Sequence, residues 1–182
     1  VLHQHNEFRV FKSKFKKLKN SLKKQALLQG ENLIKKRLGG GTGIESGTSA
    51  ISRSSFHKFK NERKIIKNNN KINILITTQD FFDAVNVYGK FLFSDFFEWL
   101  HFLGKISDIT NYNWYIKDHP NYAGKYKKYQ PFTSKITKQI LKQYKKIKYV
   151  PSNISHLQLI NEKIDYVLTV FGSVQFEYPY YN

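Results

Sequence analysis

The pair His119-Pro120, which follows the apolar stretch "NWYI", could hold a phosphate group. An imidazole can donate a hydrogen bond to a phosphate or a sugar carboxylate, and a proline fixes the backbone that aims it. Lys117 stands two residues earlier, so a strand would direct both basic side chains to the same side. We therefore expect a phosphorylated ligand here. The alternative is that the histidine makes its hydrogen bonds within its own loop.

A second segment with this chemistry is the turn at Gly172 and Ser173, where the run "DYVLTVF" ends. Gly172 permits a tight turn and a close approach of the backbone. Ser173 can cap the next helix, whose first N–H groups and positive dipole end suit a phosphate. Glu177 follows one turn later and could accept hydrogen bonds from ribose hydroxyls. The alternative is a simple helix start, with Glu177 as a surface carboxylate.

The elements that position these residues alternate from residue 72 onward. Short β-branched apolar runs predict buried strands, and amphipathic stretches predict helices between them. This alternation predicts an α/β, Rossmann-like, mostly parallel doubly wound sheet with right-handed crossovers. We expect Ser94 to cap the first of these helices. The expected strands are 72–78, 113–118, 148–152 and 165–171, and the expected helices are 92–106, 134–147 and 155–163, with another opening at 173.

In open α/β sheets, ligands bind outside the carboxyl ends of the strands. We therefore expect His119 and the Gly172 turn to border one anion-binding crevice. The strand-end residues predicted to bind the phosphorylated ligand are Thr78, Lys117, His119, Pro120, Ser152, Gly172 and Ser173, with Glu177 beside them.

The first part of the chain has a different composition. Residues 1–70 carry a balance of +13 out of the net charge of +18. Apolar residues spaced three and four apart predict one helix over 8–28, with a stripe that includes Phe11 and Leu22. We expect this stripe to pack on its own domain, and the alternative is an anionic membrane surface. The predicted division is a basic helical segment at 1–60, a linker at 61–71 and a Rossmann-like, ligand-binding domain at 72–182.

Composition narrows the remaining classes of function. The chain has no cysteine, which excludes disulfides and thiolate metal sites, and His3 with His5 lacks a third ligand. We therefore expect no metal and no cofactor. No apolar run is long enough for a transmembrane helix. A nucleic-acid partner is not favoured, because the positive charge has a second explanation. The chain is rich in Lys, Asn, Ile, Phe and Tyr, which AT-rich codons encode.

Four blocks of the sequence resemble the bacterial capsule and surface polysaccharide biosynthesis proteins. They are "FFDAVNVYGKFLFSDFFEWLHFLGKIS" (81–107), "YNWYIKDHP" (112–120), "VPSNISHLQLI" (150–160) and "IDYVLTVFGSVQFEYP" (164–179), in the order of the family. The family is similar to glycosyltransferases with two Rossmann domains (the GT-B type), including the Kdo and sialic-acid transferases. The resemblance covers about residues 72–182, with a fainter similarity from about residue 33.

The resemblance implies a function and a set of roles. It implies that His119 and Pro120 hold the nucleotide of a donor such as a CMP-sugar, that Gly172 and Ser173 form the second contact, and that Glu177 binds ribose. The family continues beyond the position of Asn182 and has a larger first Rossmann domain. With no methionine in the sequence, we expect a fragment, the donor-binding half of a partial GT-B fold, which is inactive alone.

The sequence thus predicts a glycosyltransferase-like protein of capsular polysaccharide synthesis, with a nucleotide-sugar donor and a glycan or glycolipid acceptor. Its expected location is cytoplasmic, with peripheral contact at the inner face of the membrane. The catalytic residues stay unassigned. Two alternatives remain open: a CDP-glycerol-type phosphotransferase, and a non-catalytic capsule polysaccharide export or membrane-associated protein.

Overall fold

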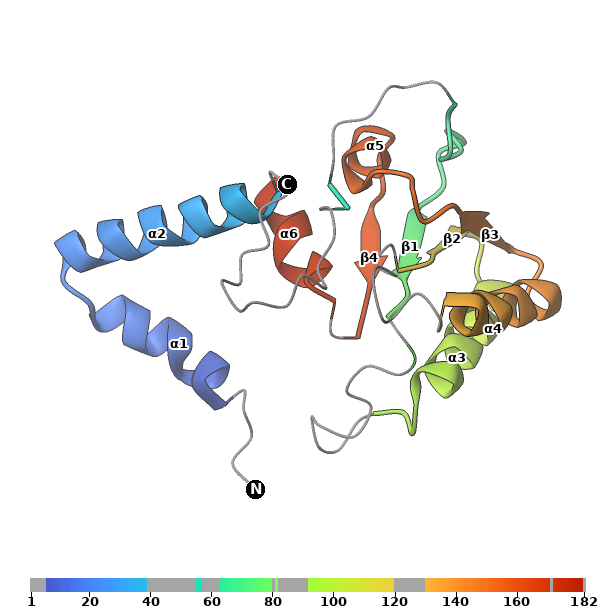
Figure 1. Ribbon diagram of the computed structural model, residues 1–182, viewed down its shortest axis with the longest axis horizontal. Coiled ribbons are helices and arrows are strands. Elements are labelled where there is room, and N and C mark those ends of the chain that lie inside the picture. The colour runs from blue at the N-terminus through green and yellow to red at the C-terminus, as the bar shows by residue number, and fades with distance from the viewer. Residues whose placement is uncertain are drawn as a thin grey trace.

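The computed structural model describes residues 6–38, 55–56, 63–79, 81, 92–119, 130–170 and 172–181. Statements on structure below concern these residues. They form a parallel sheet with helices on both faces and two further helices that extend to one side (Figure 1).

The sheet contains four parallel strands in the order β3-β2-β1-β4. The strands are β1 (Asn73–Thr77), β2 (Asn113–Lys117), β3 (Ile147–Val150) and β4 (Tyr166–Leu168). All residues of β1 and β2 are buried, as expected for central strands covered on both faces. The predicted α/β, Rossmann-like class is therefore confirmed.

Helices cover both faces of the sheet, and alternate strand residues supply the two cores (Figure 1). The core formed with α3 (Phe96–Ile109) and α4 (Gln130–Gln143) includes Ile74 and Ile76 of β1. Leu75 points to the other face, where it packs in the core formed with α5 (His156–Asn161) and α6 (Val174–Tyr181). Each face of β1 therefore has its own helical layer.

The helices α3 and α4 approach each other closely at Gly104. A Cβ atom at this position would lie only 2.3 Å from the ring of Tyr144. The tyrosine hydroxyl in turn lies 2.9 Å from Nδ1 of His101, one turn earlier on α3. Glycine thus allows the Tyr144 ring to lie flat against the α3 backbone and to complete this core.

Two helices, α1 (Asn6–Lys17) and α2 (Asn20–Leu38), replace the single helix expected at 8–28. The apolar stripe does not pack on the domain as we expected, since Phe11 is 61% exposed and Leu22 is 46% exposed. Only the end of α2 contacts a core, where Leu38 packs against the α5–α6 side. Among the described helices, none combines the length and apolar character needed to span a bilayer.

The start of α3 differs by one residue from the prediction. Asp95, rather than Ser94, is the N-cap, and its Oδ1 accepts a hydrogen bond of 2.7 Å from the N–H of Glu98. The carboxylate of Glu98 accepts from the N–H of Ser94 at 2.8 Å. This reciprocal pair satisfies two backbone donors at once, which favours Asp95 as the cap. Ser155 caps α5 in the same way, with its Oγ accepting from Leu157.

Candidate functional site at the carboxyl ends of the strands

The strand order creates a topological switch point beside β1. The chain passes from β1 through β2 to β3 on one side, and then crosses back to place β4 on the other side of β1. At such a point the connections leave the sheet in opposite directions, which opens a crevice at the carboxyl ends of the strands. The candidate site therefore centres on the residues that follow β1 and β4.

On the β2 side, Thr78 fixes the backbone that leads into His119. Its Oγ1 donates to the carbonyl of Lys117 at 3.2 Å and accepts from the N–H of His119 at 3.1 Å. His119 is half-buried, directly after the end of the strand. The side chain of Thr78, which is itself buried, thus holds the backbone of His119 next to the end of β1. Pro120 lies outside the described residues.

On the β4 side, the Gly172 turn closes against two neighbours. The N–H of Gly172 donates to Oγ1 of Thr169 at 3.1 Å. A Cβ atom on Gly172 would lie 2.6 Å from that oxygen and 3.4 Å from Nε2 of Gln79, which follows β1. The absence of a side chain is therefore what allows the turn to approach the end of β1.

His119 and Gly172 consequently lie at the same edge of the sheet, on either side of the end of β1. His119 contacts Thr78 from the β2 side, and Gly172 approaches Gln79 from the β4 side. Two segments that are far apart in the sequence thus lie next to Thr78 and Gln79, the two residues that directly follow β1.

Ser173 and Glu177 belong to the start of α6. The carbonyl of Ser173 accepts hydrogen bonds from the N–H groups of Phe176 and Glu177, which close the first turn. Glu177 is only 5% exposed. Its carboxylate therefore lies within the packed side of α6, so the alternative of a surface carboxylate is wrong, and the contact with a ribose stays a prediction.

Lys117 and Ser152 are joined directly. The Lys117 side chain is 1% exposed, and its Nζ donates to the carbonyl of Ser152 at 2.7 Å. Burial lowers the pKa of Lys117 to about 8, while the nearby Asp118 carboxylate acts in the opposite direction. This lysine therefore ties the end of β2 to the loop after β3, and its contact with a bound phosphate stays a prediction.

The hydrogen bonds that surround Asp118 could not be predicted from the sequence. This carboxylate is buried, accepts from Oγ1 of Thr137 at 2.6 Å and lies 3.3 Å from the Tyr149 hydroxyl. Burial raises the pKa of Asp118, and these two hydrogen bonds and the Lys117 charge reduce that effect. Only the long-range pairing of α4 and β3 with β2 brings these partners together, so spacing in the sequence could not reveal them.

A cavity of about 240 Å³ opens beside the switch point. It lies between the start of α3 and the residues after β4, and most of its lining is apolar. We did not predict Thr169 as a site residue, because the expected strand ran to residue 171 whereas β4 ends at Leu168. The lining residues are Leu92, Phe93, Ser94, Asp95, Phe96, Trp99, Thr169 and Val170.

This arrangement can hold an anion next to a flat apolar group. The end of β1 is bordered by an imidazole-bearing segment and by a glycine turn that opens a helix, and a ring-sized cavity lies beside the turn. An apolar cavity of about 150 Å³ can hold a benzene ring, so this cavity has room for a pyrimidine base. Within the described part of the chain, no group of three or more His, Asp or Glu residues could hold a metal ion.

Comparisons of the chain with protein-family models, curated proteins and solved structures give no match. The similarity to capsule polysaccharide proteins therefore stays a prediction from four sequence blocks.

Proposed function

We propose that this chain is the donor-binding part of a glycosyltransferase of capsular or surface polysaccharide synthesis. It binds a nucleotide-activated sugar, with a CMP-sugar as the first candidate, at the carboxyl ends of β1 and β4. The observation that carries this proposal is the meeting of His119 and the Gly172 turn on either side of the end of β1, beside a cavity with room for a base.

Each part of the site matches one part of such a donor. The cavity next to Trp99 and Thr169 accepts the base, because aromatic and apolar walls suit a flat ring. The phosphate lies near the Gly172 turn, where the backbone can approach closely and the positive dipole end of α6 attracts negative charge. His119 adds a hydrogen-bond donor on the other side of β1.

The contribution to catalysis is electrostatic. In a metal-independent transfer, negative charge grows on the phosphate of the leaving nucleotide as the bond to the sugar breaks. Fixed donors that already point at this phosphate stabilise that charge without reorganising. His119, held through Thr78, and the positive dipole end of α6 are assigned this role. We do not assign the residues that bind the glycan or glycolipid acceptor, nor the catalytic base.

A binding experiment tests this proposal. Calorimetric titration with CMP, CMP-sugars and UDP-sugars should give binding that His119→Ala weakens about tenfold, the effect of losing one charge-assisted hydrogen bond. Lys24→Ala, which removes a charge on exposed α2, is the control and should bind as the parent does. Affinity for every sugar nucleotide that is unchanged in His119→Ala would argue against the proposed site.

Contact with a membrane is part of the proposal for the first two helices. Phe11 and Leu22 are exposed on helices that also carry many lysines, a combination suited to an anionic membrane surface. We place the protein in the cytoplasm, at the inner face of the membrane. Co-sedimentation with anionic vesicles should be lost in Phe11→Ser, and sedimentation equal to that of the parent would contradict this contact.

Two alternatives use the same helices or the same edge of the sheet. A CDP-glycerol-type phosphotransferase would bind a similar nucleotide but transfer glycerol phosphate, so the product formed from CDP-glycerol or from CMP-sugars separates the two enzymes. A non-catalytic export protein would bind vesicles or polysaccharide without binding any sugar nucleotide.

A further inference from the structure

A second cavity, of about 660 Å³, lies at the amino-terminal edge of the sheet. Its walls are the segment 63–73, which leads into β1, and residues 161–165, which link α5 to β4. The candidate donor site lies at the opposite, carboxyl edge of the same strands. The two sites are therefore separated by the length of the sheet.

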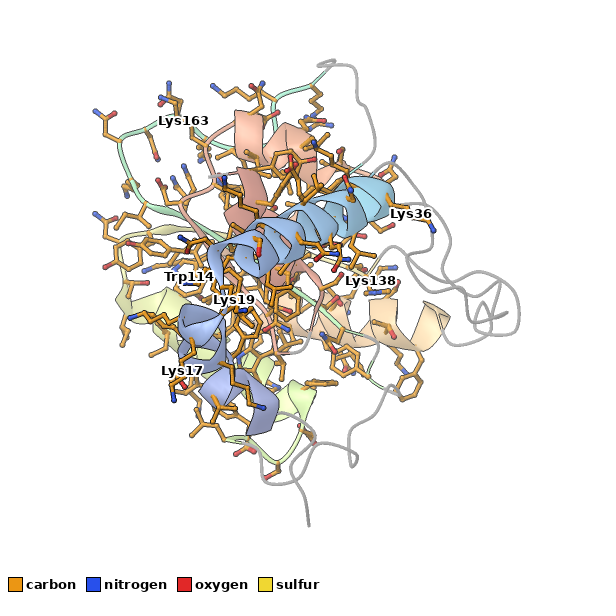
Figure 2. All side chains as sticks on the ribbon, turned by 90° about the vertical axis from the view of Figure 1, so that its left-hand side faces the viewer. Lys17, Lys19, Lys36, Trp114, Lys138 and Lys163 are labelled. Carbon is orange, nitrogen blue, oxygen red and sulfur yellow. The ribbon has the colours of Figure 1, made fainter. Side chains whose placement is uncertain are left out.

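The lining of this cavity is strongly basic. Figure 2 shows Lys163 in the upper part of the view, far from Lys17, in a region with many nitrogen-tipped side chains. Five cations and two carboxylates line the cavity. They are Arg63, Lys64, Lys67, Lys71 and Lys163, with Glu162 and Asp165.

Both carboxylates are engaged by the protein backbone. Oε2 of Glu162 accepts hydrogen bonds of 2.7 Å from the N–H groups of Ile65 and Ile66. Oδ2 of Asp165 accepts from the N–H of Asn73 at 2.7 Å. In the described part of the chain, an ion pair joins Lys35 to Glu31 on α2. None of the five cations at the cavity forms an ion pair with a described carboxylate.

Lys67 adds a like-charge contact at this edge. Its backbone N–H donates to the hydroxyl of Tyr115 at 2.9 Å, and the ammonium of Lys148 lies 5.5 Å from the centre of the Tyr115 ring. Burial and the adjacent Lys67 lower the pKa of Lys148 to about 8. Two ammonium groups held this close repel each other, and a bound oxyanion would relieve the repulsion.

Lys163 occupies a backbone position at which glycine is usual. Its φ is +69°, and it follows α5 in a Schellman motif, in which the N–H of Ile164 donates to the carbonyl of Leu159 at 3.2 Å. A residue with a Cβ atom is disfavoured in this left-handed conformation. Glycine would form this turn with less strain, so the turn itself does not explain the lysine. The lysine does place a cation at the cavity.

Amide groups complete the site. The side chains of Asn69 and Asn113 exchange two hydrogen bonds, and Nδ2 of Asn113 also donates to Oδ1 of Asn73 at 2.9 Å. Nζ of Lys71 donates to Oδ1 of Asn111. These bonds hold the start of β1 and the segment before it in place, so the cations project from a fixed frame.

We propose that this cavity is a second anion site, which binds a ligand bearing two or more phosphate groups. Five cations surround one open cavity, and none of them forms an ion pair with a carboxylate of the described residues, an arrangement that matches a multivalent anion better than a monovalent one. The site is independent of the donor site at the other edge of the sheet.

The first test is calorimetric titration of the whole chain with inorganic tripolyphosphate at low salt. Lys163→Gly removes one charge and relieves the left-handed backbone, so it should bind about three- to fivefold more weakly while the melting temperature stays the same or rises. Combining it with Lys67→Met should weaken binding further. Lys24→Ala on α2 and His119→Ala at the donor site should both bind tripolyphosphate as the parent does.

Specific outcomes would overturn the proposal. If Lys163→Gly binds tripolyphosphate as tightly as the parent, the cavity is not the site. If Lys24→Ala weakens binding equally, the effect is that of net charge alone. Because His119→Ala changes only donor binding and Lys163→Gly only tripolyphosphate binding, either proposal can fail without the other.

A second arm identifies the source of the phosphates. Vesicles containing phosphatidylinositol phosphate are sedimented with the chain, with and without tripolyphosphate. Sedimentation that tripolyphosphate and Lys163→Gly both abolish supports the site with a lipid headgroup as ligand. Sedimentation that neither changes, together with tripolyphosphate binding that depends on Lys163, supports the site with a soluble ligand.

Discussion

Replacing Lys117 by methionine should stabilise the protein at neutral pH. The side chain is 1% exposed, and burial disfavours its charged form. Methionine has a similar length and no charge, so it can fill the same space between β2 and the loop at Ser152. The change removes the penalty of holding an ammonium in this place together with its hydrogen bond to the Ser152 carbonyl.

The magnitude follows from the pKa. A pKa of about 8 against the ordinary 10.5 corresponds to a penalty of roughly 3 kcal/mol below pH 8, where Lys117 is charged in both folded and unfolded chains. Losing the hydrogen bond to Ser152 costs about 1 to 2 kcal/mol. Lys117→Met should therefore raise the free energy of unfolding by about 1 to 2 kcal/mol at neutral pH.

The pH dependence has a defined sign. Because the folded chain releases the Lys117 proton first, the penalty fades as the pH rises through 8 towards 10.5, and the parent protein gains stability. From about pH 7 to about pH 9.5 the gain should be about 2 kcal/mol. Burial raises the pKa of Tyr115, so its ionisation acts in the opposite direction at higher pH, and the measurement stops before that range.

Urea denaturation of the parent and of Lys117→Met at several pH values tests this reasoning. The variant should lack most of the rise in stability. Lys148→Met is the matched control, because burial also lowers the pKa of Lys148 to about 8, but its side chain is only half-buried, so that solvent screens part of the effect. If Lys117→Met shows the same rise with pH as the parent, Lys117 is not the source and the argument fails.

Two further changes test the packing. Gly104→Ala should lower the free energy of unfolding by about 2 kcal/mol, because its methyl group would overlap the Tyr144 ring. Gly30→Ala lies in open space on α2 and should raise the free energy of unfolding by about 0.5 to 1 kcal/mol. Similar urea curves for the two variants would contradict this expectation. Tyr178→Phe removes the buried hydrogen bond of 2.7 Å to Nδ1 of His156 and should destabilise by about 1 to 2 kcal/mol, and an unchanged midpoint in urea would refute that contribution.

Much of the fold could be read from local patterns, and the rest depended on distant contacts. The β-branched run predicted at 72–78 is β1, at Asn73–Thr77, because a buried central strand has a strong apolar signature. The helix predicted at 134–147 begins earlier, at Gln130, since a proline at position 131 is accepted in the first turn of a helix. The place of β4 beside β1 could not be derived, because alternation fixes the parallel direction and not the order of strands.

The candidate site could also be predicted only in part from the sequence. The strand ends at His119 and Gly172 could be found from the breaks in the apolar runs, and the structure brings both to one edge. The contact of the Lys117 side chain could not be predicted. Alternation along a strand assigns a side chain to a face of the sheet, but it does not show that the ammonium donates to the carbonyl of Ser152 in the loop after β3. The basic cavity was also missed, because the segment at 61–71 was interpreted only as a linker.

The central position of β1 has a consequence for the kinetics of folding. Its partner β4 is about 90 residues away, as the hydrogen bond from the N–H of Asn73 to the carboxylate of Asp165 illustrates. During synthesis, one edge of β1 must wait until nearly all of the chain described here has been made. Such high contact order slows the search for the native sheet, and the waiting apolar strand is a natural substrate for chaperones.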